Sequence, residues 1–214
     1  MPFRLHLVRH AEGTHNPGHD TTIHDPPLTE NGVKQSEDLS QDFPFNERVG
    51  LVITSPLTRT LHTALLGFQK ALDKKYYTNG LGVANGATLV LEPDVQAHTA
   101  RPCDTGSDWS VVRARFPDLQ WELLAQDASF PGKKGRYVPE HEALFHRGHA
   151  VQAKLEEKFK ELEGSDRPDI AVVTHGGFMK YIANDREVPN TAKCRTVLVT
   201  FDEESRLIAE NIPT

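Results

Sequence analysis

The chain has 214 residues, with 24 Lys and Arg against 30 Asp and Glu and a formal net charge of −6. This acidic balance argues against a nucleic-acid-binding protein, but it allows a small anionic ligand held by a local positive cluster. No apolar run approaches the ~20 residues of a membrane span, and the first residues lack signal-peptide architecture. The two cysteines form no disulfide framework. We therefore expect a cytoplasmic protein with no nucleic-acid and no membrane partner.

Predicted strands and helices alternate along the chain. In order we expect a strand at 3–8, a helix at 29–42, a strand at 51–54, a helix at 57–73, a strand at 88–91, helices at 108–116 and 140–162, a strand at 169–174, a helix at 177–183 and a strand at 196–201. This alternation predicts an α/β fold with a mostly parallel sheet flanked by helices on both faces. The length predicts a single domain over residues 1–214.

Charged and imidazole side chains follow three of the predicted strands. Arg9 and His10 follow the first, Arg59 lies shortly after the second, and His175 and Gly176 follow the fourth. Because ligands of such sheets bind outside the carboxyl ends of the strands, we expect these residues to converge. Guanidinium forks match phosphate oxygens, and a glycine at a helix N-terminus lets backbone N–H groups approach an anion. The sequence therefore predicts a phosphate pocket that contains imidazoles.

Four sequence blocks, in this order, resemble motifs of the histidine phosphatase superfamily, which has the phosphoglycerate-mutase-like fold: LVRHAEGTHN, DPPLTENGVKQS, SPLTRTLHTA and VVTHGGF. They span Leu7 to Phe178, and RPCDTGSD resembles a branch of small phosphatases and phosphoglycerate-mutase-like proteins. Ala11 stands where the family usually has glycine. The resemblance implies a phosphatase that hydrolyses a small phosphate ester or anhydride with neither metal nor cofactor.

The resemblance also implies roles for individual residues. His10 would be the nucleophile that becomes phosphohistidine. Arg9, Arg59 and His175 would bind the transferred phosphoryl group and stabilise its charge. Asn16 stands where the family has another phosphate-contacting side chain.

Further substrate contacts are expected from residues near these motifs. We expect Gly176 to contribute backbone N–H groups to substrate binding. Two side chains of the irregular segment before residue 106, His98 and Arg101, are expected to contact the organic part of the substrate.

One position departs from the family pattern. The family usually has a glutamate as general acid after the third strand, and the corresponding residue of this chain is Ala97. Alanine cannot donate a proton, so the resemblance implies impaired activity unless another group donates or the leaving group needs no proton. The candidate donors nearby in the sequence are Asp104, Glu92, Asp94 and His98, and Asp104 or His98 is the next candidate for the acid.

Three alternative functions remain open from the residues. A phosphoglycerate-mutase-type phosphotransferase would use the same pocket, but the short chain favours hydrolysis. A non-catalytic sensor of a phosphorylated ligand would retain the pocket without the acid at Ala97. A metallohydrolase would use the histidines crowded at 10–24, or His146 and His149 on one helix face. The sequence indicates no particular oligomeric state.

Overall fold

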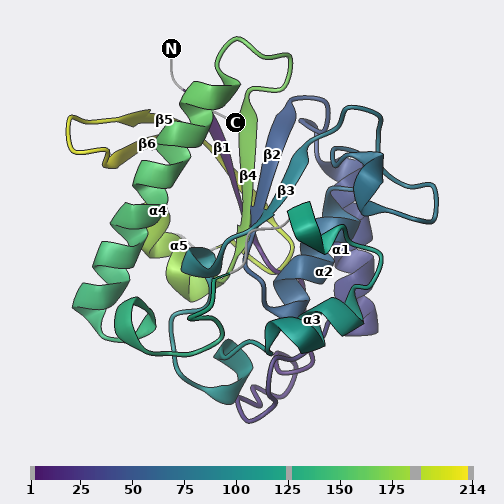
Figure 1. Ribbon diagram of the computed structural model, residues 1–214, viewed down its shortest axis with the longest axis vertical. Coiled ribbons are helices and arrows are strands. Elements are labelled where there is room, and N and C mark those ends of the chain that lie inside the picture. The colour runs from purple at the N-terminus through teal and green to yellow at the C-terminus, as the bar shows by residue number, and fades with distance from the viewer. Residues whose placement is uncertain (1–2, 124–126, 184–188, 212–214) are drawn as a thin grey trace.

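The computed structural model describes residues 3–123, 127–183 and 189–211 (Figure 1). Within these residues one sheet contains β1 (Phe3–Arg9), β2 (Val49–Thr54), β3 (Thr88–Leu91), β4 (Asp169–Thr174), β5 (Cys194–Phe201) and β6 (Leu207–Asn211). The order across the sheet is β3-β2-β4-β1-β5-β6. The first four strands in this order are parallel, and the β1–β5 and β5–β6 pairs are antiparallel. The predicted mostly parallel sheet is therefore confirmed.

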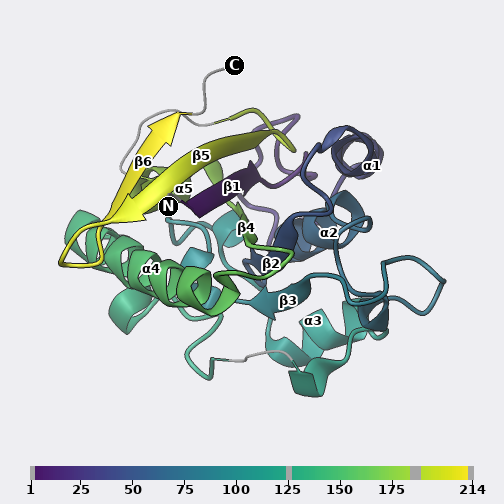
Figure 2. The ribbon, with the colours of Figure 1, turned by 90° about the horizontal axis from the view of Figure 1, so that it is seen from above.

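Helices cover both faces of this sheet. The first face carries α1 (Glu30–Asp42), α2 (Thr58–Gly67) and α3 (Trp109–Arg115), and the opposite face carries α4 (His141–Leu162) and α5 (Gly176–Ala183), as Figure 2 shows. Short 3-10 turns lie in the connections at Lys74–Tyr76, Pro93–Val95, Pro102–Asp104, Trp121–Leu123 and Gly135–Tyr137. None of the helices in the described ranges is both long and apolar enough to cross a bilayer.

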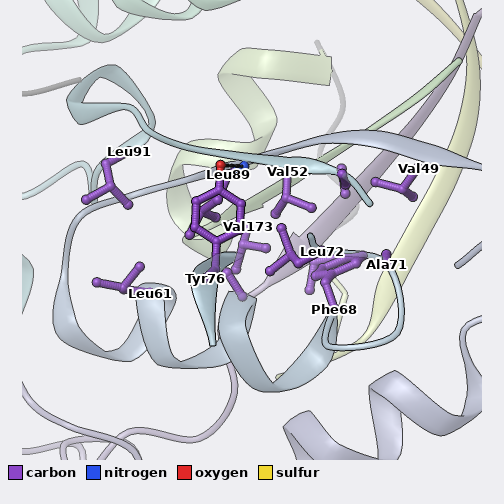
Figure 3. Close-up of a cluster of buried hydrophobic side chains, with 14 of the residues drawn as sticks. Val49, Val52, Leu61, Phe68, Ala71, Leu72, Tyr76, Leu89, Leu91 and Val173 are labelled. Carbon is purple, nitrogen blue, oxygen red and sulfur yellow. Dashed lines mark hydrogen bonds between the residues drawn. The ribbon is translucent and has the colours of Figure 1, made fainter. Parts of the chain in front are cut away.

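The two covered faces explain why the central strands are almost continuously apolar. Leu7 of β1 packs into the cluster under α4 and α5, whereas its neighbour Val8 packs into the cluster under α1 and α2. Successive side chains of a strand point to opposite faces, so both must be apolar in a doubly covered sheet. Figure 3 shows the second of these clusters, in which the Tyr76 hydroxyl accepts a hydrogen bond of 3.0 Å from the Leu89 backbone N–H.

The predicted helix at 57–73 was too long, because α2 ends at Gly67. A Cβ atom at Gly67 would lie 2.8 Å from Cδ2 of Leu39, so this glycine permits the close approach of α1 and α2. After the helix, Leu72 forms a parallel bridge with Ala87 at the edge of the sheet. Tertiary pairing therefore overrides the helical pattern beyond Gly67.

Strand β6 was not predicted. It follows a tight turn in which Ser205 has φ of 58°, and it pairs with β5 at the edge of the sheet. Buried and exposed side chains alternate in β6, since Leu207 is 3% exposed and Ile208 is 50% exposed. A strand this short at the end of the chain has too few alternating positions to give a clear signal.

Asp25 fixes the start of α2 from a distant loop. Its carboxylate is fully buried and accepts hydrogen bonds from the Thr58 backbone N–H (2.9 Å) and hydroxyl (2.7 Å). It also accepts from the Ser107 hydroxyl (2.7 Å) and the Arg115 guanidinium (2.8 Å). The N-cap residue of α2 provides no side-chain hydrogen bond, so Asp25 acts as an external cap. Because Arg59 follows Thr58 in the first turn of α2, Asp25 also fixes the position of the Arg59 backbone.

We predict that Asp25→Ala lowers the free energy of unfolding by about 3 kcal/mol, because it leaves buried donors and a guanidinium without their acceptor. Urea unfolding followed by circular dichroism measures this change. Asp38→Ala, at an exposed position on α1, is the matched control and should change stability by no more than about 0.5 kcal/mol. An equal effect of the two substitutions would contradict the capping role.

Candidate active site

A cavity of about 250 Å³ lies where β1, β2 and β4 end. Arg9 of β1 pairs with Thr174 of β4, and Thr54 of β2 pairs with Val173, so the three strands end at the same level. The lining consists of Arg9, His10, His15, Asn16, Arg59, His98, Asp104, His175, Gly176 and Gly177. The structure thus brings together most of the site residues predicted from the sequence.

The tautomer of His10 follows from its two hydrogen bonds. Nδ1 lies 2.8 Å from the Ala11 carbonyl oxygen, which can only accept, so Nδ1 carries the proton. Nε2 lies 3.2 Å from Nε of Arg59, which can only donate, so Nε2 presents a lone pair. Burial and the Arg59 charge hold the pKa of His10 well below its usual value. His10 is therefore a neutral imidazole with its lone pair next to the cavity.

Arg59 is the central residue of the cavity. Its side chain is 1% exposed and lies between the ends of β1 and β4. Besides His10, it donates hydrogen bonds to the Cys103 carbonyl oxygen at 2.7 Å, to Oδ1 of Asp104 at 3.2 Å and to Nδ1 of His175 at 2.9 Å. A single guanidinium therefore positions both buried histidines.

His175 has the opposite tautomer to His10. Its Nδ1 accepts from Arg59, so its Nε2 carries the proton and donates to Oγ of Ser55 at 3.0 Å. Burial, followed by the Arg59 charge, holds the pKa of His175 well below its usual value. The imidazole rings of His10 and His175 lie 5.1 Å apart between centroids. Sequence reasoning missed Ser55, although it directly follows β2 and so lies at the expected edge.

A tight turn at the end of β1 adds further groups to the lining. The Asn16 side chain accepts from the Gly13 backbone N–H at 2.8 Å and lies 3.1 Å from Nε2 of His15. Burial, then Arg59, lowers the pKa of His15 to about 4. The sequence assigned His15 only to a possible metal cluster, although its place beside Asn16 was a usable signal. Arg9 is half-buried, and burial lowers its pKa.

The far wall of the cavity combines His98 with the start of α5. A Cβ atom at Gly177 would lie 2.0 Å from Cε1 of His98, so glycine is required for this close approach. Burial is the main cause that lowers the pKa of His98. Gly176 begins α5 directly at the cavity, where unpaired backbone N–H groups favour an anion.

Asp104 is held as an acceptor. Its Oδ1 accepts from Arg59 at 3.2 Å, and its Oδ2 accepts from the Thr99 hydroxyl at 2.6 Å. The geometry suits a residue that orients Arg59.

Ala97 and Arg101, both predicted as site residues, lie outside the cavity lining. The Ala97 side chain is 1% exposed and packs with Leu57 and Phe130. Arg101 is exposed at the start of the turn Pro102–Asp104.

Two cations that were not among the predicted site residues lie beside Ala97. Nζ of Lys133 donates to the Ala97 carbonyl oxygen at 3.0 Å and to Oε1 of Gln96 at 2.7 Å. The buried Arg147 guanidinium donates to the Gln96 carbonyl oxygen at 3.0 Å and lies 4.1 Å from the Phe178 ring centroid. Lys133 falls in an irregular segment and Arg147 on a long helix, so spacing alone could not place them here.

The histidines considered as metal ligands do not gather. Among residues 3–123, 127–183 and 189–211, no three His, Cys, Asp or Glu side chains are grouped so that they could hold a metal ion. His146 of α4 is 72% exposed, and its nearest carboxylate is Glu142 at 3.9 Å. The described residues therefore offer no ligand set for the metallohydrolase alternative.

Comparison with known proteins agrees with this geometry. Residues 5–77 match the family model of the histidine phosphatase superfamily, branch 1. A probable phosphatase of Schizosaccharomyces pombe is 26% identical over 178 residues, which cover 80% of this chain and 73% of the relative. Phosphoglycerate mutase-like protein 1 of Arabidopsis thaliana is 29% identical over 214 aligned positions, which cover 84% and 70%.

The fold likeness extends over almost the whole chain. The structure of a mycobacterial glucosyl-3-phosphoglycerate phosphatase superposes with a TM-score of 0.59 and 16% identity, covering 99% of this chain and 98% of that one. The sequence match includes the segment with Arg9, His10 and Arg59. The segment that carries Arg9, His10 and Arg59 therefore matches the histidine phosphatase superfamily, and a relative that aligns with 80% of the chain is named a probable phosphatase.

Proposed function

We propose that residues 1–214 form one catalytic domain, a metal-independent phosphatase that hydrolyses a small phosphate ester or anhydride through a phosphohistidine on His10. The observation that carries the proposal is the state of His10 in the cavity. Its Nδ1 proton is held by the Ala11 carbonyl, and its Nε2 lone pair faces the buried Arg59 guanidinium. A nucleophilic imidazole must be neutral at the attacking nitrogen and fixed at the other one.

In the first step, Nε2 of His10 gives up its hydrogen bond from Arg59 and attacks phosphorus while the bond from phosphorus to the leaving oxygen breaks. Arg9 and Arg59 bind the phosphoryl oxygens, together with the backbone N–H groups at the start of α5. The phosphoryl dianion favours uptake of a proton from solvent by His175, which then donates to a phosphoryl oxygen and returns the proton to solvent when phosphate leaves. These cations stabilise the charge that spreads over the oxygens in the transition state.

In the second step, water attacks the phosphohistidine and releases phosphate. His10 returns to its neutral form, with Nδ1 still bonded to the Ala11 carbonyl.

A phosphoglycerate-mutase-type enzyme would instead pass the phosphoryl group to a second hydroxyl. The short chain of 214 residues favours hydrolysis, because a mutase must shield the phosphohistidine from water. Cytoplasmic location belongs to the same proposal, since the small phosphorylated molecules it acts on are metabolites.

We predict that rapid quenching of the protein with radiolabelled p-nitrophenyl phosphate traps a base-stable, acid-labile label. His10→Ala should abolish both labelling and turnover, because no other imidazole in the cavity presents its Nε2 lone pair toward Arg59. His146→Ala, at an exposed position on α4, should keep both. Full labelling of the His10 variant would overturn the assignment of the nucleophile.

We predict that Arg59→Ala lowers kcat/KM by ~100-fold or more, because a guanidinium that contacts the phosphoryl oxygens acts mainly on the transition state. Arg59→Lys should recover little of this loss, since an ammonium lacks the fork. Arg113→Ala, at an exposed arginine on α3, is the control. Thermal unfolding of each variant separates loss of the fold from loss of the ligand, and a decrease below about threefold in a folded Arg59→Ala variant would remove Arg59 from the mechanism.

We predict that activity survives dialysis against EDTA, because the arginines supply the charge that a metal would otherwise supply. Phosphate release before and after dialysis, together with elemental analysis, measures this. Restoration of a lost activity by a stoichiometric transition metal would instead favour the metallohydrolase.

A further inference from the structure

The first step of the proposed mechanism expels an oxygen that must receive a proton when it belongs to an alkyl group. Ala97 cannot provide one, and its side chain packs against Leu57 and Phe130. We propose that Lys133 is the proton donor to the leaving oxygen. This inference rests on the phosphatase function proposed above and adds the acid that its alkyl substrates require.

The position of Lys133 carries the proposal. Nζ lies 3.0 Å from the Ala97 carbonyl oxygen, although the two residues are 36 positions apart in the sequence. The side chain of Gln96 holds the same nitrogen at 2.7 Å. An ammonium has three donor hydrogens, and the two acceptors within the described residues use two of them. The third is available to a leaving oxygen.

The surroundings of Lys133 tie it to the cavity. Its positive charge lowers the pKa of His175 and of His98, which both line the cavity. In turn, burial first and then the neighbouring Arg147 charge lower the pKa of Lys133 to about 7. An acid works best when its pKa lies near the working pH, and burial beside another cation is a known way to bring a lysine there.

The other groups near this position are poorer donors. Both oxygens of Asp104 are already engaged, one by the Arg59 guanidinium and the other by the Thr99 hydroxyl. The lowered pKa of His98 favours its neutral form. Arg147 keeps its proton at any working pH, since burial lowers its pKa only to about 10. Lys133 is the cation of this group that can lose a proton near neutral pH.

The two steps balance in protons. As the phosphorus–Nε2 bond of His10 forms, the leaving oxygen takes a proton from Nζ of Lys133, which becomes a neutral amine. Water then attacks phosphorus, the phosphorus–Nε2 bond breaks, and the amine takes the proton that water loses. The products are an alcohol and phosphate, and both residues return to their starting forms.

The test compares Lys133→Met with the unaltered protein on an alkyl phosphate, glycerol 3-phosphate, and on p-nitrophenyl phosphate. Nitrophenolate is a weak base and needs little help from an acid. We expect kcat/KM for the alkyl ester to fall by ~100-fold or more and that for the nitrophenyl ester to change by less than about fivefold. Lys134→Met, at the adjacent exposed lysine, should change neither.

The pH dependence provides the second readout. In the unaltered protein, the ratio of alkyl to nitrophenyl kcat/KM should fall as pH rises through about 7, since the donor loses its proton there. This ratio should be low and independent of pH in Lys133→Met. Lys133→Arg keeps the charge but not the proton transfer, so its ratio should also stay low.

Three outcomes would overturn the proposal. The first is an equal loss on both esters in Lys133→Met, which indicates a binding or structural role. The second is full alkyl activity in Lys133→Arg, which indicates that charge alone suffices. The third is an unchanged pH profile of the ratio. Labelling of His10 by p-nitrophenyl phosphate in Lys133→Met separates these results from a failure of the phosphatase mechanism itself, because that labelling needs no strong acid.

Discussion

The buried guanidinium of Arg59 is the interaction on which the rest of the site depends. It is 1% exposed and donates to an imidazole from each of two strand ends and to two groups of the turn at Pro102–Asp104. A buried guanidinium without acceptors would cost several kcal/mol, so its partners must stay in place for the protein to fold. The same contacts assign the tautomers of His10 and His175. The hydrogen bonds that allow Arg59 to be buried are therefore the same ones that orient the two histidines of the cavity.

This constraint is maintained from outside the cavity. Arg59 lies in the first turn of α2, whose start is held by Asp25, and Asp25 is in turn held by donors from Ser107 and α3. In this series of contacts, which runs from α3 through Asp25 to the start of α2, Arg59 lines the cavity and Asp25 does not. Rigid elements position a site more accurately than loops do, and here a loop carboxylate links two such elements.

Much of the site could be predicted from the sequence because the chemistry follows strand ends. Arg9, His10 and His175 come directly after apolar runs, and parallel strands end at one edge. Lys133 could not be predicted in this way, since its place beside Ala97 results from packing of a segment without regular structure. The early end of α2 likewise needed the contact of Gly67 with α1. Local pattern thus predicts what a strand or helix presents, while contacts between distant irregular segments depend on the whole fold.

The positive charge of Arg59 has two effects, and both favour the proposed reaction. Burial and then the Arg59 charge lower the pKa of His10 and keep it neutral, and in the proposed mechanism the same charge attracts the phosphoryl group that His10 would attack. When a phosphoryl dianion enters, it offsets this charge and favours the protonated form of His175, which has no nucleophilic role. His10 would not be protonated in the same way, because the substrate phosphorus approaches Nε2, the nitrogen that would accept the proton. Under the proposed mechanism, the opposite tautomers of the two histidines would therefore let one ligand be attacked by His10 and stabilised by His175.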